Sequence, residues 1–300
     1  MPEYTPKIGL PTPLGNENVS LAAHKGLITA IDNIVGNHIE DKNNPHGLTV
    51  GQIGAVPMPG ADGLLRLGQT VLADDVLPKS AVEKILYVST TGNDSTGNGT
   101  KAKPYRTIQR AVDVIPNIHM HAYTIACAAG TYPEEVFIKG LLGGSVKIQL
   151  DGIAPSAKDG YTGLNVLSIL AEECMCYIQI NDVDFYNSST ISRNAIIRFT
   201  RSMYGAVNNC RFDSDPKVNG KYSVLYDASK GNIYNSYFLN QFTCLRAQSG
   251  SQVIWSDNNT HAATKSDFGL SVSSSIVHKV GALNLNATTL ETTVSGGVIY

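Results

Sequence analysis

Three phenylalanines recur at nearly equal intervals in the second half of the chain, and this repeat constrains the fold more than any other sequence feature. Phe185, Phe212 and Phe238 are separated by 27 and 26 residues. An apolar residue lies five positions before each of them, and Asp or Asn lies three positions before: Ile180, Val207 and Ile233; Asp182, Asn209 and Asn235. Repeats of this length are typical of stacked supersecondary units. The sequence therefore predicts a solenoid with about 25 residues in each coil.

The spacing inside each repeat predicts a turn. Side chains alternate along a strand, so two inward residues five positions apart cannot lie on one unbroken strand. Asn and Asp tolerate the left-handed backbone conformation, so the Asp/Asn positions are predicted turns and the phenylalanines are predicted core residues. The residues just before the phenylalanines are then expected to face outward: Asp184, Arg211 and Tyr237. A fourth copy is expected at Ile254, Ser256 and Asn259 after a shorter gap.

Residues 87–139 predict how the solenoid begins. A short apolar strand and a Gly/Asn/Ser/Thr-rich loop precede Pro104. After this proline, four apolar residues lie at helical spacing: Ile108, Ala111, Val112 and Ile115. We expect a helix within residues 104–116 that covers the open first coil. A turn at 130–133 and a strand at 136–138 follow. From this start, the solenoid is predicted to span residues 87–300.

The same stretch carries a family resemblance. It reads YVSTTGNDSTGNGTKAKPYRTIQRAVDVIP, followed by AAGTYPEEVFI. It resembles the opening of pectin-lyase-like right-handed parallel β-helices, a group that includes polysaccharide lyases, glycoside hydrolases and many bacteriophage tailspikes. The resemblance implies a mainly β fold, a right-handed parallel β-helix wound as a single-stranded solenoid. It implies no single function, because many chemistries and non-catalytic spikes share this fold.

The first 86 residues have a different composition. Among 14 Tyr, 7 Phe and 1 Trp, only Tyr4 precedes Tyr87, whereas eight of the 13 prolines do. These few large side chains cannot form an ordinary globular core. This segment must therefore pack on a partner or on copies of itself. Residues 1–20 are predicted to be a docking tail, and residues 43–86 an extended linker.

Residues 21–42 show the spacing of a short coiled coil. Six residues lie at intervals of 3, 4, 3, 4 and 3, as the a and d positions of a coiled coil do, and form its predicted seam: Leu21, His24, Ile28, Ile31, Val35 and His38. Isoleucine at both kinds of seam position favours three strands. Gly26 and Gly36 weaken so short a helix, so a larger trimeric body must support it. The alternative is one amphipathic helix packed on the rest of the chain. The two seam histidines either fix the register or place three imidazoles around an axis, where they can hold an anion, water or a metal.

Two N-terminal phrases add a second resemblance. NNPHGLTVGQIGAVP at 43–57 and LPTPLGNENV at 10–19 are similar to N-terminal and linker segments of bacteriophage tail fibres. This implies a structural virion protein, made in the host cytoplasm: a homotrimer that attaches to other virion proteins by its N-terminus and presents the β-helix to host cell-wall or capsule glycan. The alternatives are a glycan depolymerase of lyase or hydrolase type, and a connector or scaffold protein in the virion.

The composition limits the classes of partner that this protein is expected to bind. A net charge of −2 argues against nucleic acid or an anionic membrane held by bulk electrostatics. The sequence contains no apolar run long enough to span a bilayer and no hydrophobic signal segment at its start. Five cysteines do not suggest a disulfide framework. Cys174 and Cys176 are better explained as two buried small hydrophobes than as a metal pair.

Candidate site residues are few, and no cofactor is predicted. Asp184 and Asp213 are weak catalytic candidates, because neighbouring coils can bring two carboxylates to the separation that glycosidases use. Tyr234, Tyr237 and Trp255 are candidates for glycan binding. His119 and His121 share a strand face, but no further ligand stands nearby, so no metal site is predicted.

Overall fold

The computed structural model describes residues 3–4, 11–12, 20–40, 66–67, 70–71, 83–186, 190–212 and 221–300, and the chain forms two compact units, 1–72 and 73–300. The first unit contains helix α1 (Leu21–Glu40) and two antiparallel pairs of short strands. These strands are β1 (Glu3–Tyr4) with β2 (Pro11–Thr12), and β3 (Arg66–Leu67) with β4 (Thr70–Val71). Apart from these strands, Ser20 and residues 83–86, the predicted tail and linker lie outside the described residues.

The second unit is mainly β and consists of two sheets of parallel strands. Among the described residues, the first sheet has nine strands: β5 (Lys84–Val88), β6 (Ala122–Cys127), β8 (Leu142–Leu150), β10 (Met175–Asn181), β13 (Tyr204–Asn208), β16 (Lys230–Tyr234), β19 (Gln252–Ser256), β22 (Ile276–Val280) and β24 (Val298–Ile299). On the same basis the second has eleven: β7 (Gly130–Lys139), β9 (Leu164–Glu172), β11 (Asp184–Phe185), β12 (Ala195–Thr200), β14 (Arg211–Phe212), β15 (Tyr222–Asp227), β17 (Tyr237–Phe238), β18 (Thr243–Gln248), β20 (Thr260–His261), β21 (Ser266–Ser273) and β23 (Ala287–Val294).

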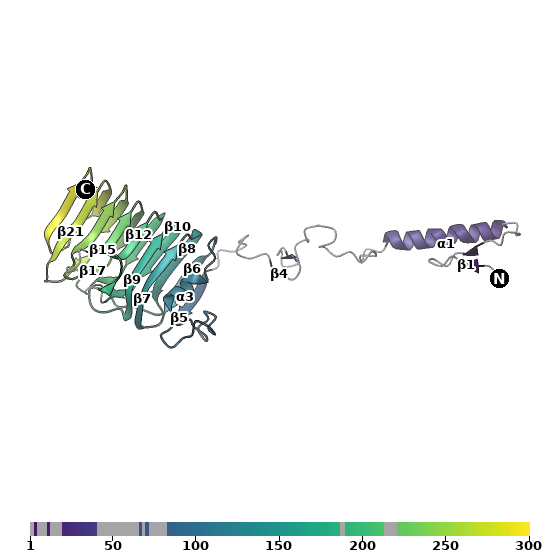
Figure 1. Cartoon of the computed structure of the whole chain (residues 1–300), viewed down its shortest axis with the longest axis horizontal. Helices are drawn as coiled ribbons and strands as arrows, with labels where there is room; N and C mark the ends of the chain where they lie inside the picture. Colours follow the sequence, from purple (N-terminus) through teal and green to yellow (C-terminus); the bar gives the residue numbers. More distant parts are fainter. Residues whose placement is uncertain are drawn as a thin grey trace. The chain divides into compact units, whose positions relative to one another are not determined.

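The chain winds through both sheets once per coil. Strand β9 pairs with the short β11 through its first half and with β12 through its second half, so the second sheet curls into two faces. In the first sheet, successive register partners are 27, 26, 22 and 24 residues apart: Ile178, Gly205, Gly231, Val253 and Val277. The strands lie side by side from β5 to β21 in Figure 1. These all-parallel, curled sheets form a solenoid-like body that is compatible with the predicted parallel β-helix.

Helix α3 (Ile108–Asp113) lies at the start of the solenoid, as predicted, although it is shorter than residues 104–116. It packs against β5, β6 and β7. The predicted apolar face is buried: Ile108, Ala111, Val112 and Ile115. Two distant carboxylates cap its N-terminus, because Asp94 accepts the backbone N–H of Thr107 and Glu134 accepts those of Ile108 and Gln109. Strand β5 begins at Lys84, three residues before the predicted start.

The turn predicted at 130–133 was wrong. These residues open β7: Gly130 to Tyr132 already pair with β9, and the pairing resumes at Glu135. The register shifts between Tyr132 and Glu135, which marks a bulge around Pro133. Proline has no N–H to donate to a ladder, so a bulge accommodates it within the sheet. The same irregularity lets Glu134 reach the start of α3.

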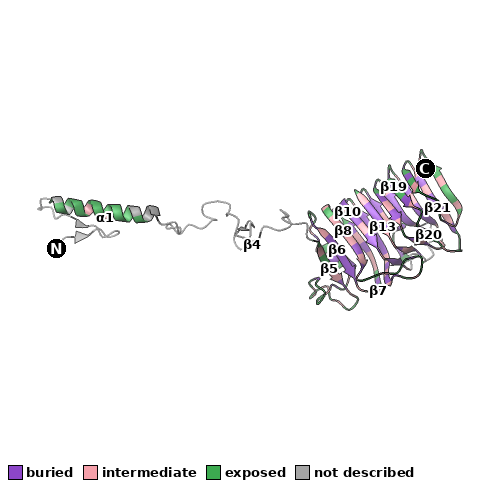
Figure 2. Cartoon of the chain, turned by 180° about the vertical axis from the view of Figure 1, so that it is seen from behind, coloured by how far each residue is buried: buried purple, intermediate pink, exposed green. Residues whose placement is uncertain are grey.

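The predicted phenylalanine core was confirmed. Phe185, Phe212 and Phe238 are register partners in adjacent coils, and all three are buried, inside coils whose interior Figure 2 shows in purple. Their ring centroids lie 5.1 and 4.8 Å apart, with interplanar angles of 13° and 7°. Stacked aromatic residues therefore form a continuous column along the solenoid interior.

The fourth copy was misplaced. Trp255, not Ile254, is the register partner of Ile233, a shift of one residue. The position of the phenylalanines is taken by His261, two residues after the predicted Asn259. The Trp255 ring packs against Phe238 with a centroid distance of 5.2 Å. The indole therefore ends the aromatic column.

The predicted turn residues were confirmed. Asp182, Asn209 and Asn235 have φ values of 59°, 52° and 54°, within the left-handed region. Their side chains also link neighbouring coils, since Nδ2 of Asn209 donates to Oδ1 of Asp182 at 2.7 Å. This corner is therefore stabilised both by backbone preference and by side-chain hydrogen bonds.

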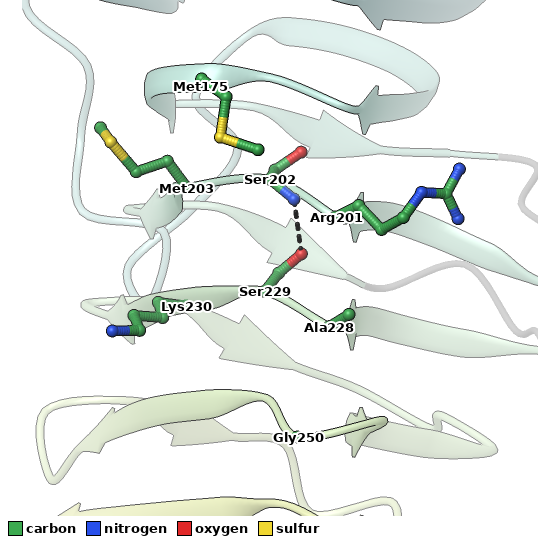
Figure 3. Close-up of a pocket in the computed structure, with 8 residues that line it drawn as sticks. All are labelled: Met175, Arg201, Ser202, Met203, Ala228, Ser229, Lys230 and Gly250. Atoms are coloured by element: carbon green, nitrogen blue, oxygen red, sulfur yellow. Dashed lines mark hydrogen bonds between the residues drawn. The ribbon is translucent and has the colours of Figure 1, made fainter.

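A second corner was not predicted. Arg201, Ala228 and Ser274 have positive φ, and each is followed directly by a buried serine. The N–H of Ser202 donates to Oγ of Ser229 at 3.0 Å, as Figure 3 shows, and the N–H of Ser229 donates to Oγ of Ser251 at 3.1 Å. This serine ladder satisfies backbone N–H groups where the strands are interrupted.

Candidate functional site

The described seam residues of α1 are exposed. Ile28, Ile31 and Val35 are 55%, 45% and 49% exposed within this structure, and His24 is exposed as well. The side chains of Leu21 and His38 lie outside the described residues. Figure 2 shows α1 largely in green. The coiled coil stays a prediction, and the helix presents apolar side chains that no described residue covers.

Asp184 is buried rather than accessible. It lies in β11 beside Phe185, and its Oδ2 accepts the N–H of Gly163 at 2.8 Å. The neighbouring Arg211 donates from Nη1 to the carbonyl oxygen of Ala157 at 2.7 Å. The segment between β8 and β9 therefore covers this carboxylate, which was expected to face outward. Asp213 lies outside the described residues, so the catalytic role of the pair stays an untested prediction.

Two of the three predicted glycan-binding residues have occupied or buried rings. Tyr237 is half-buried, and the Arg211 guanidinium lies 4.2 Å from its ring centroid and 4.7 Å from that of Tyr161. This cation–π contact occupies one face of the Tyr237 ring. Trp255 was a candidate for glycan binding but is only 1% exposed, and as the register partner of the buried Ile233 its indole points inward. Trp255 is therefore a core residue.

Tyr234 lies on the outer face of the first sheet, together with two other tyrosines. The rings of Tyr177 and Tyr204 stack at 5.4 Å, and Nε2 of Gln179 donates to the Tyr234 hydroxyl at 3.3 Å. Burial raises the pKa of all three phenols, and the proximity of Tyr234 raises those of Tyr177 and Tyr204 further. These hydroxyls are therefore neutral donors and acceptors at neutral pH. We call Tyr177, Tyr204 and Tyr234 the tyrosine cluster.

A groove of about 400 Å³ continues from this cluster toward the last coils. Strands β13, β16, β19 and β22 contribute its walls, together with Tyr300, which follows β24. Its principal side chains are Tyr204, Lys230, Gln252, Ile254, His278 and Tyr300. It combines ring faces, amide and imidazole groups and an ammonium group. We call it the outer groove.

A stripe of exposed apolar residues follows the start of the first sheet. Ile118, Leu142 and Met175 are register partners in successive coils, and together with Met120 and Met203 they are between 42% and 65% exposed. Met175 and Met203 line a hollow of about 370 Å³ that also includes Lys230. In Figure 3, Met203 and Lys230 extend to one side of the coils and Arg201 to the other. We call these five residues the apolar stripe.

The histidine and cysteine pairs that were considered as metal ligands, and not predicted to be sites, are buried. His119, His121, Cys174 and Cys176 all lie inside the structure. Within the described ranges, no group of three or more His, Cys, Asp or Glu residues is placed to hold a metal ion. Nor does that part of the chain contain a helix with the length and apolar character needed to cross a membrane.

The tyrosine cluster and the outer groove were largely missed by the sequence interpretation. A signal did exist, because Tyr177 and Gln179 alternate with the buried Cys176, Ile178 and Ile180 along β10. Parity from the predicted inward Ile180 places Tyr177 and Gln179 outside. The same rule applied to Val207 places Tyr204 outside.

Comparison with known families gives one match, to the model described as a protein of unknown function (DUF1565), over residues 90–137. That family is associated with parallel β-helix proteins. The matched region contains α3, β6 and most of β7, which together open the solenoid. No curated protein and no solved structure matches the chain. The chain is therefore similar to this family at the start of its solenoid.

Proposed function

We propose that this chain is a structural fibre or spike protein of a bacteriophage particle. Three copies associate, residues 1 to about 60 attach to other virion proteins, and the solenoid, a right-handed parallel β-helix, is presented to host-surface glycan. The resemblance of residues 10–19 and 43–57 to tail-fibre segments supports the attachment role. The protein acts by binding and by its shape, without cleaving its ligand.

The observation that carries this proposal is the exposed apolar seam of α1. A 20-residue helix is marginal alone, and the exposure of Ile28, Ile31 and Val35 leaves its apolar side without cover. Association of three identical helices buries these residues around an axis. The apolar stripe supports the same conclusion, because exposed apolar patches that extend over several coils mark association surfaces.

The outer face of the first sheet supports glycan recognition. Sugars are bound in proteins by aromatic ring faces together with fixed hydrogen-bonding groups, and the outer groove provides both. A glycan depolymerase has less support, because Asp184 is buried and already accepts a backbone N–H. A connector or scaffold role differs from the proposed one in requiring no glycan.

Sedimentation of the full chain tests the trimer. We expect the wild-type protein to be trimeric and the Ile28→Lys/Ile31→Lys variant to be monomeric, because lysines at the seam cannot be buried together. Thr29→Lys/Asn33→Lys is the matched control, since it adds the same charge at exposed positions outside the seam and should stay trimeric. A monomeric wild-type protein would contradict the proposal.

Binding to host material tests the recognition role. The trimer is mixed with extracts of candidate host cell walls, and both bound protein and released reducing ends are measured. We expect binding without release. Release of reducing ends would favour the depolymerase, and a trimer that binds none of the extracts would favour the connector.

A further inference from the structure

The apolar stripe follows the edge of the solenoid where the strands of the first sheet begin. Leu142 and Met175 are the first residues of β8 and β10, and Met203 directly precedes β13. Backbone hydrogen bonds join these positions from coil to coil, because the N–H of Met175 donates to the carbonyl oxygen of Leu141 and that of Met203 to the carbonyl oxygen of Cys174, both at 2.7 Å. The stripe is therefore a continuous apolar path that crosses four adjacent strands, β6, β8, β10 and β13.

This path ends at a hollow that carries a positive charge. Met175 and Met203 line the hollow of about 370 Å³, and Lys230 borders it on the next coil. The Met203 and Lys230 side chains extend to the same side of the coils in Figure 3. Lys230 is exposed and makes no ion pair with any residue that the structure describes. We call this site the methionine hollow. It suits an occupant in which apolar side chains stand next to a carboxylate.

The chain enters the solenoid at the same edge. Residues 73–82 belong to the same compact unit as the solenoid and lie outside the described residues. Glu83 follows them directly, and its carboxylate accepts a hydrogen bond from the Thr124 hydroxyl in β6. Ile118 and Met120, the first residues of the stripe, lie just before β6. The segment 73–82 is therefore joined to the first sheet beside the start of the stripe.

This segment carries the chemistry that the stripe requires, in matching order. It reads ADDVLPKSAV over residues 73–82. Counted back from β5, Val82 comes first, the apolar pair Val-Leu at 76–77 follows, and two aspartates at 74–75 come last. Along the solenoid from β5, the stripe presents its apolar residues first and Lys230 last.

The segment is also long enough to reach the methionine hollow. Four strand spacings separate β5 from β13, which is about 19 Å at about 4.8 Å each. Leu77 lies six residues before Glu83, and six extended residues span about 20 Å at about 3.3 Å each. Leu77 can therefore reach Met203. Asp75 lies two residues further back, enough to cross the next strand spacing to Lys230.

We infer that residues 73–82 bind along the apolar stripe of their own chain. The apolar pair 76–77 packs in the methionine hollow, and the aspartates at 74–75 pair with Lys230. The linker is then held against the solenoid over several coils and leaves it near β16, not at β5. The inference goes beyond the proposed function, which is carried by the α1 seam, and assigns the stripe a partner from the same chain.

Limited digestion of the full chain with trypsin tests this contact, because the Lys79–Ser80 bond lies inside the segment. Met175→Ser/Met203→Ser should raise the rate of cleavage at this bond about tenfold or more, since the open form is cleaved and a buried apolar contact changes its population by at least about that factor. Ile153→Ser is the matched control. It also removes an exposed apolar side chain, but from the segment between β8 and β9, and should leave the rate unchanged.

A double-mutant cycle tests the ion pair. Asp74→Asn/Asp75→Asn and Lys230→Gln should each raise the rate of Lys79–Ser80 cleavage about two- to fivefold, as expected for an ion pair near the surface. All three changes together should raise it no further than either set alone, because both sets break the same contact. Lys147→Gln is the control, since Lys147 lies in β8 outside the methionine hollow, and should have no effect.

Cross-linking identifies the chain that supplies the segment. Ala73→Cys and Ala228→Cys place one thiol at the start of the segment and another on the rim of the methionine hollow. The five native cysteines are buried and should not react with a short bismaleimide. We expect the two new thiols to be joined within one chain, and the link to be largely lost when Met175→Ser/Met203→Ser is added.

Three results would overturn the inference. Unchanged cleavage of the Lys79–Ser80 bond in Met175→Ser/Met203→Ser would show that the segment does not lie on the stripe. Fully additive effects in the cycle would show that the aspartates do not pair with Lys230. Two linked chains on a denaturing gel would make the stripe a contact between copies of the protein. The first two results leave the proposed trimer untouched, because it depends on α1.

Discussion

The interior of the solenoid and the outer face of its first sheet are built from the same strands but follow different rules. Inside, the same chemistry recurs coil after coil, as in the stack of Phe185, Phe212 and Phe238. Outside, the register column that contains Tyr177 and Tyr204 continues with Lys230 and Gln252, so no residue type persists. Residue types that repeat from coil to coil pack the interior, whereas residue types that change from coil to coil form an outer surface that can recognise a ligand.

The largest effect is expected in the centre of the aromatic column. Phe212 stacks on a ring at both sides, so Phe212→Ala removes two stacking contacts and leaves a cavity. We expect the free energy of unfolding to fall by about 3–5 kcal/mol, measured by denaturant unfolding. Phe242→Ala is the matched control, because Phe242 is half-buried and lies outside the column. This substitution should lower the free energy of unfolding by less than half as much. Equal costs would mean that the column has no special role.

A smaller effect is expected where a glycine faces a large ring. Gly205 lies against the Phe199 ring, and Gly231 against the Tyr226 ring and the carbonyl oxygen of Gly205. One coil later, Ala247 follows Tyr226 in register and Val253 follows Gly231. A large residue in one sheet is thus matched by a small one in the other, which keeps the volume of each coil filled.

Gly231→Ala breaks this match. The added Cβ overlaps the Gly205 carbonyl oxygen, a backbone atom that cannot rotate away. We expect a loss of about 3 kcal/mol in the free energy of unfolding, the upper end of the range for overpacking. Gly160→Ala meets no atom within 4 Å and should change stability by less than about 0.5 kcal/mol. A neutral Gly231→Ala would show that the two sheets are less tightly packed than the contacts indicate.

The contrast between the interior and the outer face also explains how much of the fold could be predicted from the sequence. The period of the phenylalanines and the left-handed preference of Asp182, Asn209 and Asn235 are local signals that repeat, so the solenoid and one of its corners followed from them. The register step shortens from 26 to 22 residues between the coils of Gly231 and Val253. Two large apolar residues, Ile254 and Trp255, are adjacent at this point. The sequence pattern alone did not show which of them points inward, and Ile254 was chosen in place of Trp255.

The second corner and the outer groove were harder to predict. Arg201, Ala228 and Ser274 share a backbone conformation but no side-chain chemistry, so only the serines after them repeat. The cover over Asp184 depends on a long segment between β8 and β9, whose path no local pattern specifies. Groove residues such as His278 become neighbours of Lys230 only when the coils are stacked in the correct register.

The smallest effect is expected on the outer face, where one strand offers a direct comparison. In β19, Val253 is 2% exposed and points into the coil, whereas the next residue, Ile254, is 42% exposed on the groove side. Val253→Ala removes buried methyl groups and should lower the free energy of unfolding by about 2 kcal/mol. Ile254→Ala removes more carbon but from a surface already in water, and should change it by less than about 0.5 kcal/mol. If Ile254→Ala proves as destabilising as Val253→Ala, the outer face contributes to folding as the interior does, and the separation between the two regions fails.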